Sequence, residues 1–116
     1  MSITFSIQGE HHCGDYDCAD CNARQLNLAN RNALDLLVFL GIEPDYCGGI
    51  RGRELAQRVE NALADPHATD PEVPTTESRG GRVISCGRPA GYLRERATWL
   101  LDIARLAGDL GRVSWG

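Results

Sequence analysis

Two apolar helical patterns constrain the fold of this chain more than any other feature of its sequence. The first covers residues 27–40, begins at Asn27 as a favoured N-cap residue and stops before Gly41. Its apolar residues point to nearly every side, as they do in a helix that is buried in a core. The second lies between Pro89 and Gly111 and carries a wide apolar face. We expect the two helices to cover each other through Leu36, Leu37, Leu40, Leu93, Leu100 and Ile103.

Shorter patterns complete the expected fold. Alternating apolar residues over 3–7 predict a strand with one buried face, and residues 82–86 and 112–115 predict two more short strands. Residues 53–64 carry one apolar stripe and predict a peripheral amphipathic helix. A chain of 116 residues has the length of one domain. The sequence therefore predicts a single α+β domain, residues 1–116, in which about three helices pack on a small antiparallel sheet of about three short strands.

Two segments between these elements lack a regular apolar pattern. Residues 41–52 contain Pro44 and a pair of glycines, which predicts a turn-rich connection. Residues 65–81 contain three prolines and two glycines but almost no large apolar side chain. Such a segment cannot bury enough apolar surface to offset its loss of conformational entropy, and no residue in it is recognisable as an anchor. We expect residues 65–81 to form a flexible surface loop.

Charge and composition exclude several classes of function. The net charge is -4, whereas non-specific binding to nucleic acid depends mainly on positive charge, so we expect no nucleic-acid partner. The longest apolar run, from Leu36 to Leu40, is too short to cross a bilayer, and the N-terminus lacks the pattern of a secretory signal. All twelve basic residues are arginine, which is typical of GC-rich coding sequences. We therefore expect a cytoplasmic protein of a bacterium or a phage that contacts no membrane.

The residues best suited to chemistry are the cysteines and histidines of the segment 10–22. Cys13, Cys18 and Cys21 form a C-x4-C-x2-C pattern, and His12 directly precedes it. Two residues between thiolates let one turn direct both sulfur atoms at a single ion, and an imidazole can complete a tetrahedral site of three cysteines and one histidine. Disulfides are disfavoured in the cytoplasm, so this loop predicts a structural zinc ion bound by His12, Cys13, Cys18 and Cys21.

Other interpretations of the same loop stay open. The carboxylates around the thiols oppose thiolate formation, which favours cysteines without any metal. The spacing also matches three ligands of a plant-type two-iron ferredoxin cluster, with Cys47 as a fourth. Asp15, Asp17 and Asp20 could instead bind a hard cation, and a cysteine with a histidine base could act as a nucleophile.

Polar residues near the starts of two expected helices form a second candidate site. Asn27 and Asn30 lie three positions apart, so one helix face would present both amides to a polar ligand. Arg51 follows a glycine pair and precedes the helix over 53–64, where an anion such as phosphate is favoured. Helix capping by the asparagines and a solvated position for the arginine are the competing interpretations.

These residues predict a non-enzymatic module that binds a protein partner or a small ligand, with its segment 10–22 closed by zinc. A small metal-dependent or cysteine-dependent enzyme is the alternative. A pocket that combines cysteine or histidine with Asn27 or an arginine would favour the enzyme. An apolar surface patch would favour the binding module, and a two-fold interface would favour a homodimer of it.

Overall fold

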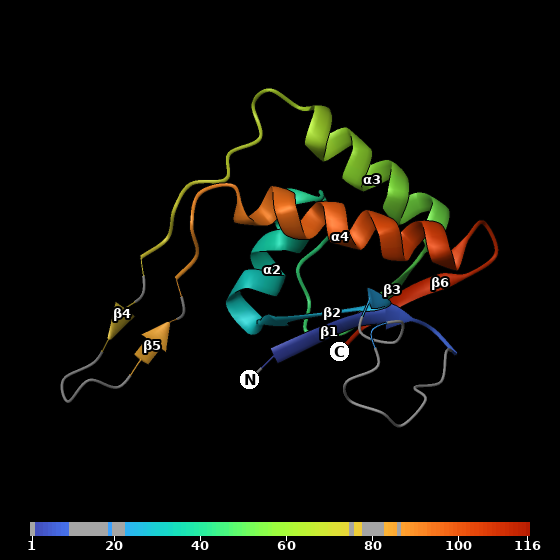
Figure 1. Cartoon of the computed structure of the whole chain (residues 1–116), viewed down its shortest axis with the longest axis horizontal. Coiled ribbons are helices and arrows are strands. Elements are labelled where there is room, and N and C mark those ends of the chain that lie inside the picture. The colour runs from blue at the N-terminus through green and yellow to red at the C-terminus, as the bar shows by residue number, and fades with distance from the viewer. Residues whose placement is uncertain (1, 10–18, 20–22, 75, 78–82, 86) are drawn as a thin grey trace.

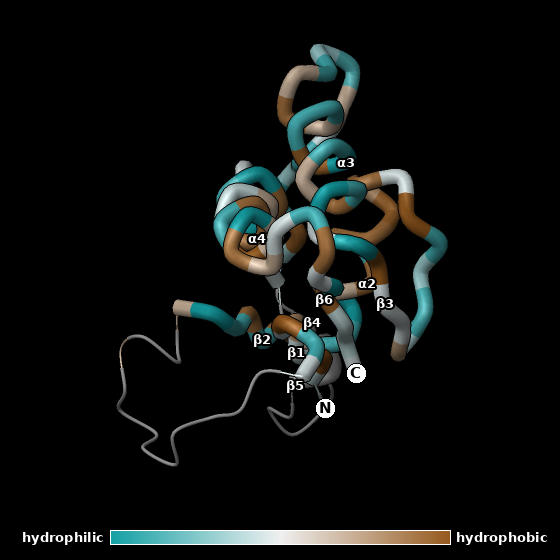
Figure 2. Tube along the Cα trace, turned by 90° about the vertical axis from the view of Figure 1, so that its right-hand side faces the viewer, coloured by the Kyte–Doolittle hydropathy of each residue, from teal (hydrophilic) through white to brown (hydrophobic). Residues whose placement is uncertain are grey.

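A computed structural model of the chain confirms the predicted α+β fold. It describes residues 2–9, 19, 23–74, 76–77, 83–85 and 87–116. Four strands form one antiparallel sheet in the order β2-β1-β6-β3, and the helices α2, α3 and α4 lie over one face of it (Figure 1, Figure 2). In chain order the elements are β1 (Ser2–Ile7), β2 (Gln25–Ala29), α2 (Asn30–Phe39), β3 (Gly48–Arg51), α3 (Gly52–Ala64), β4 (Thr76–Glu77), β5 (Val83–Ser85), α4 (Tyr92–Ala107) and β6 (Arg112–Trp115).

The predicted core is confirmed. Alternate residues of β1, β2 and β6 are buried, such as Ile3, Leu28 and Val113, so the face of the sheet that meets the helices is apolar. The side chains that alternate with them, such as Thr4, Ser114 and Arg112, are polar or charged and lie on the opposite face. All six residues expected to join the two apolar helices are buried in one cluster: Leu36, Leu37, Leu40, Leu93, Leu100 and Ile103.

The predicted helix over residues 27–40 is wrong at its start. α2 begins at Asn30, because the preceding residues form β2 and pair with β1 through Ile3↔Leu28 and Phe5↔Leu26. The alternation in β2 is too short to stand out from the helical pattern that follows it, and its ladder partners lie far away in the sequence. Asn27 therefore lies in the middle of a strand and caps no helix.

Two other expectations about element boundaries need correction, and one about burial. The segment 41–52 contains β3, which has Ile50 as its one large apolar residue and depends on its ladder with β6. α4 ends at Ala107 because Gly108 adopts a φ of 73°, and Leu110 beyond it is fully exposed. Val38 is 59% exposed, so α2 is covered on fewer sides than its composition predicts.

The predicted end of the first helix is confirmed. Gly41 has a φ of 71°, a left-handed conformation that favours glycine. Its N–H donates to the carbonyl of Val38 at 2.9 Å, and the N–H of Ile42 donates to the carbonyl of Leu37 at 2.9 Å. These two bonds form a Schellman motif, which satisfies carbonyls that the end of a helix leaves unpaired. The motif directs the chain out of α2 toward β3.

The segment after α3 contains an anchor that the sequence does not reveal. A carboxylate oxygen of Asp70 accepts a hydrogen bond of 2.9 Å from the N–H of Arg94, in the first turn of α4. The Arg94 side chain reaches back to the carbonyls of Leu63 (3.1 Å) and Asp65 (3.4 Å) at the end of α3. Each helix end is thus capped by a residue from outside it. Flexibility of residues 65–81 as a whole stays a prediction.

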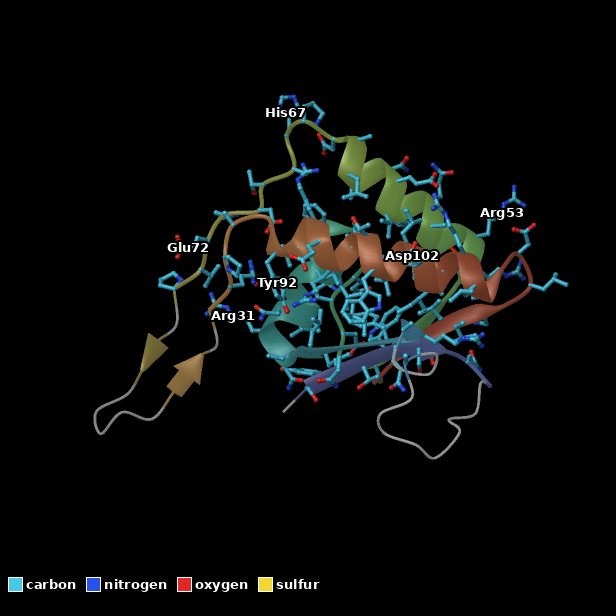
Figure 3. The ribbon with its side chains drawn as sticks, viewed as in Figure 1. Arg31, Arg53, His67, Glu72, Tyr92 and Asp102 are labelled. Atoms are coloured by element: carbon cyan, nitrogen blue, oxygen red, sulfur yellow. The ribbon has the colours of Figure 1, made fainter. Side chains whose placement is uncertain are left out.

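Replacing Asp70 by alanine should lower the free energy of unfolding by about 0.5 to 2 kcal/mol, the usual cost of losing an N-terminal cap. Urea denaturation followed by circular dichroism measures this change. Glu72→Ala is the matched control, because Glu72 is exposed and points away from the body (Figure 3). Equal denaturation midpoints for the two variants would show that the Asp70 hydrogen bond contributes nothing to stability.

A buried arginine joins the same region to α2. The Arg88 side chain is 7% exposed and donates hydrogen bonds to Asn32 (3.1 Å) and Asp35 (2.7 Å). The backbone of Arg88 pairs with Val73. Beyond this pair, β4 and β5 extend away from the body as a two-stranded arm (Figure 1). None of the helices in the described part of the chain combines the length and the apolar composition needed to cross a bilayer.

Candidate functional site

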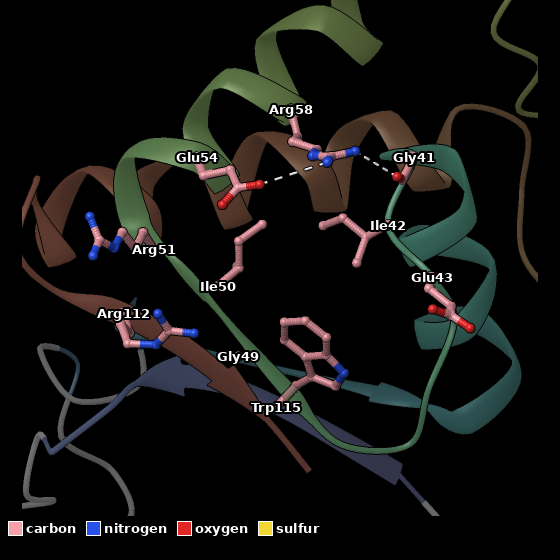
Figure 4. Close-up of a pocket in the computed structure, with 10 residues that line it drawn as sticks. All are labelled: Gly41, Ile42, Glu43, Gly49, Ile50, Arg51, Glu54, Arg58, Arg112 and Trp115. Atoms are coloured by element: carbon pink, nitrogen blue, oxygen red, sulfur yellow. Dashed lines mark hydrogen bonds and ion pairs between the residues drawn. The ribbon is translucent and has the colours of Figure 1, made fainter.

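A pocket of about 310 Å³ lies between the segment that leaves α2, the strand β3 and the helix α3. In Figure 4, Gly41 and Glu43 stand on one side of it, Arg51 and Arg112 stand on the other, and Trp115 lies between them. The chain from Gly41 to Arg51 thus makes a wide turn around the pocket. Its lining residues are Gly41, Ile42, Glu43, Gly49, Ile50, Arg51, Glu54, Arg58, Arg112 and Trp115.

The indole of Trp115, with Ile42 and Ile50, forms the apolar part of the pocket. Two contacts fix the position of Trp115. Its Nε1 donates a hydrogen bond of 3.2 Å to the carbonyl of Asp45, and its ring centroid lies 5.8 Å from the ring centroid of Phe5. The ring also lies against Gly48, where a Cβ atom would approach it to 2.5 Å. The lack of a Cβ atom at Gly48 therefore makes room for the indole, which is largely buried.

One wall of the pocket is closed by an arginine that already has partners. Arg58 donates from Nη1 to the carbonyl of Gly41 at 2.6 Å, and its Nη2 lies 3.7 Å from a carboxylate oxygen of Glu54 (Figure 4). The first bond ties α3 to the glycine that ends α2. The guanidinium group of Arg58 thus has partners within the protein. Its role at the pocket is to fix the position of Gly41 relative to α3.

The opposite wall carries two arginines from neighbouring strands. Arg51 of β3 and Arg112 of β6 stand directly opposite each other in the antiparallel ladder. Both are exposed, and within the residues that the structure describes neither makes an ion pair. Like charges at directly opposed positions destabilise a sheet. This pair therefore attracts an anion to the mouth of the pocket.

The structure separates the three residues predicted to bind a ligand. Arg51 lines the pocket, at the N-terminus of α3 as expected. Asn27 lies in β2, at the other edge of the sheet, where its amide donates to the hydroxyls of Ser2 (3.1 Å) and Thr4 (2.7 Å). Asn30 is the first residue of α2 and is half-buried. The two asparagines thus belong to different elements and share no helix face.

The sequence does not single out the other residues that matter at this site. Arg112 and Trp115 belong to the strand expected over residues 112–115, where alternation places them on opposite faces of the sheet, so no pattern along one face links them. Their meeting with Arg51 depends on the pairing of β6 with β3, two elements about sixty residues apart. No local pattern records that pairing.

The predicted zinc ligands His12, Cys13, Cys18 and Cys21 lie outside the described residues. In the part of the chain that is described, no group of three or more His, Cys, Asp or Glu residues is placed to hold a metal ion. Cys47 there is free and exposed, and His67 lies at the turn after α3, pointing outward (Figure 3). Among the described residues that line the pocket, only Glu43 and Glu54 carry side chains that could bind a metal ion.

The described residues that line the pocket offer several groups for binding a ligand. They include no Ser, Thr, Cys, Lys or His, and among them the carboxylates of Glu43 and Glu54 are the side chains that could act as a nucleophile or a base. The lining places the apolar side chains of Ile42, Ile50 and Trp115 beside five charged ones, of which Arg51 and Arg112 make no ion pair within the described residues. Convergent charged groups beside apolar side chains can orient a ligand. Comparison with known proteins assigns no family, because no protein-family model, no curated protein and no solved structure matches the chain.

Proposed function

We propose that this protein is a non-enzymatic binding module whose ligand carries an anionic group beside an apolar group. The observation that carries the proposal is the pair Arg51 and Arg112, opposed across β3 and β6 without a carboxylate partner among the described residues. An anion between the two guanidinium groups would relieve their repulsion and accept charge-assisted hydrogen bonds from both. The apolar group of the ligand would lie against Trp115, Ile42 and Ile50.

Titration with benzoate and with phenyl phosphate tests the proposal, because each probe joins an anion to an apolar ring. The indole N–H signal of Trp115 is the reporter in ¹H–¹⁵N NMR spectra, since this group lies at the pocket and bonds to Asp45. We expect the chemical shift of this signal to change as each probe is added and to reach a plateau when the site is saturated. Arg112→Gln should weaken binding about tenfold or more, because a hydrogen bond to a charged group contributes about 1.5 to 3 kcal/mol.

Arg53→Gln is the matched control for Arg112→Gln. Arg53 is exposed, lies outside the pocket lining and points away from the body (Figure 3), so its loss removes the same charge from the protein without touching the site. An equal loss of affinity in both variants would show that the weaker binding results from the change in net charge and not from the position of Arg112. Absence of any shift of the Trp115 signal with either probe would overturn the proposed function.

The zinc loop over residues 10–22 is a separate proposal that rests on the cysteine and histidine spacing. Cys18→Ser should abolish stoichiometric zinc binding but leave the helical circular dichroism unchanged, because the core is built from other residues. Elemental analysis of protein purified without added metal measures this. Cys47→Ser is the control, since Cys47 lies outside the proposed ligand set, and zinc retained by Cys18→Ser would refute the assignment. We propose a bacterial or phage origin because all basic residues are arginine, and a cytoplasmic location because the apolar runs of the sequence are short.

A further inference from the structure

The strand beside the pocket has one free edge. β3 is the last strand in the sheet order, and no other strand of the described chain pairs with its outer side. The N–H of Gly52 donates to the carbonyl of Gly111 at 3.0 Å, which fixes the alternation of the ladder. Ile50 and Gly48 therefore direct their backbone groups toward β6, whereas Gly49 directs its N–H and carbonyl outward and Arg51 directs its N–H outward.

From this edge we infer that the anionic ligand is an extended acidic segment of a partner protein, which adds to β3 as a fifth, antiparallel strand. The inference rests on the proposed function and names the chemical class of its ligand. The pocket lies along this edge, because its lining includes the consecutive residues Gly49, Ile50 and Arg51. Antiparallel addition continues the pattern of the whole sheet, and main-chain hydrogen bonds of this kind supply affinity in many peptide-binding modules.

The register of β3 dictates which side chains such a segment presents. Residues directly opposite each other in a ladder place their side chains on the same face. Partner residues opposite Arg51 and Gly49 thus lie on the face that carries Arg51 and Arg112, where carboxylates are favoured. The partner residue opposite Ile50 lies on the other face, beside Trp115, where an apolar side chain is favoured. The expected motif is acidic–apolar–acidic.

Charge selects a different protein over a second copy of this chain as the occupant. The strand β3 itself reads Gly-Gly-Ile-Arg and carries no carboxylate. Two copies joined edge to edge would bring Arg51 and Arg112 of both copies close to one another on the same surface, and like charges oppose such pairing. An acidic segment instead neutralises the two guanidinium groups, which make no ion pair within the part of the chain that the structure describes.

The test uses the peptide acetyl-Ser-Asp-Ile-Glu-Ser-amide and two forms of it with one methylated backbone nitrogen. In the expected register the glutamate lies opposite Gly49 and donates its N–H to the Gly49 carbonyl, whereas the N–H of the isoleucine points to solvent. Methylation at the glutamate should weaken binding about tenfold, through a lost hydrogen bond and the bulk of the methyl group. Methylation at the isoleucine should leave the dissociation constant within about threefold of the parent. Titration calorimetry measures all three.

The outcomes separate this inference from the proposed function. If both methylated peptides bind as the parent does, or both weaken equally, strand addition is overturned, while benzoate binding that depends on Arg112 keeps the anion site. If neither benzoate nor phenyl phosphate shifts the Trp115 signal, the proposed function falls as well. Sedimentation of the protein alone adds a further check: a dimer that the peptide dissociates would identify a second copy as the occupant and overturn the inference.

Discussion

Leu37→Ala is expected to lower the free energy of unfolding by about 2 to 5 kcal/mol, the range found when a buried leucine is cut to alanine. Leu37 is fully buried in the cluster that joins α2 to α4 and to the sheet. Truncation removes the transfer free energy of the lost carbon atoms and leaves a cavity that packed neighbours on three elements fill only in part. Urea denaturation at constant temperature gives the difference.

Val38→Ala is the control for this experiment. Val38 is the next residue of α2, but it is 59% exposed, so its truncation should change stability by less than about 0.5 kcal/mol. Both variants truncate an aliphatic side chain of the same helix, by three carbon atoms at Leu37 and by two at Val38, and the two positions differ mainly in burial. Similar urea denaturation midpoints for Leu37→Ala and the unsubstituted protein would show that Leu37 does not belong to the core.

Gly52→Ala should produce the second large effect, a loss of about 1 to 3 kcal/mol or more from overpacking. Gly52 is the first residue of α3 and lies against the end of α4, where a Cβ atom would stand 2.6 Å from the carbonyl oxygen of Ala104 and 2.8 Å from that of Gly108. Both oxygens belong to the backbone, so no side-chain rotation relieves the contact. The clash outweighs the gain of about 1 kcal/mol that alanine brings to a helix.

Gly49→Ala separates this clash from the general effect of replacing a glycine. Gly49 lies three residues earlier, in β3, and a Cβ atom there meets its nearest neighbours at 3.7 Å, which is ordinary contact. We expect Gly49→Ala to leave stability within about 0.5 kcal/mol of the parent. Thermal unfolding of both variants provides the comparison. If Gly52→Ala and Gly49→Ala unfold at the same temperature, α3 and α4 do not approach as closely as the structure places them.

The proposed site combines one residue that the sequence indicates with two that depend on strand pairing. Arg51 is recognisable from its position between a glycine pair and a helix start. Its partner Arg112 and the indole of Trp115 come from the last strand, and the pairing of β3 with β6 makes the three residues neighbours. The same pairing leaves β3 at the edge of the sheet, so the charged mouth of the pocket and the free backbone groups lie side by side.

By itself the sequence determined those parts of the fold that local periodicity encodes. Helices α3 and α4 repeat their apolar residues over several turns, Gly41 marks the end of α2, and alternation marks β1 and β6. Such patterns depend on residues a few positions apart, whose side chains share a face whatever the rest of the chain does. The core residues follow from them, because apolar faces of this width have to cover one another.

The tertiary structure alone decided the elements that depend on distant partners. β2 and β3 are four or five residues long, and they become strands because β1 and β6 offer them hydrogen bonds. The carboxylate of Asp70 becomes a cap when α4 starts beside it. The candidate pocket belongs to the same class, since its walls come from three separate parts of the chain. Pairing between residues that are remote in the sequence produces no periodic pattern along the chain. The proximity of Arg51, Arg112 and Trp115 is therefore visible only in the tertiary structure.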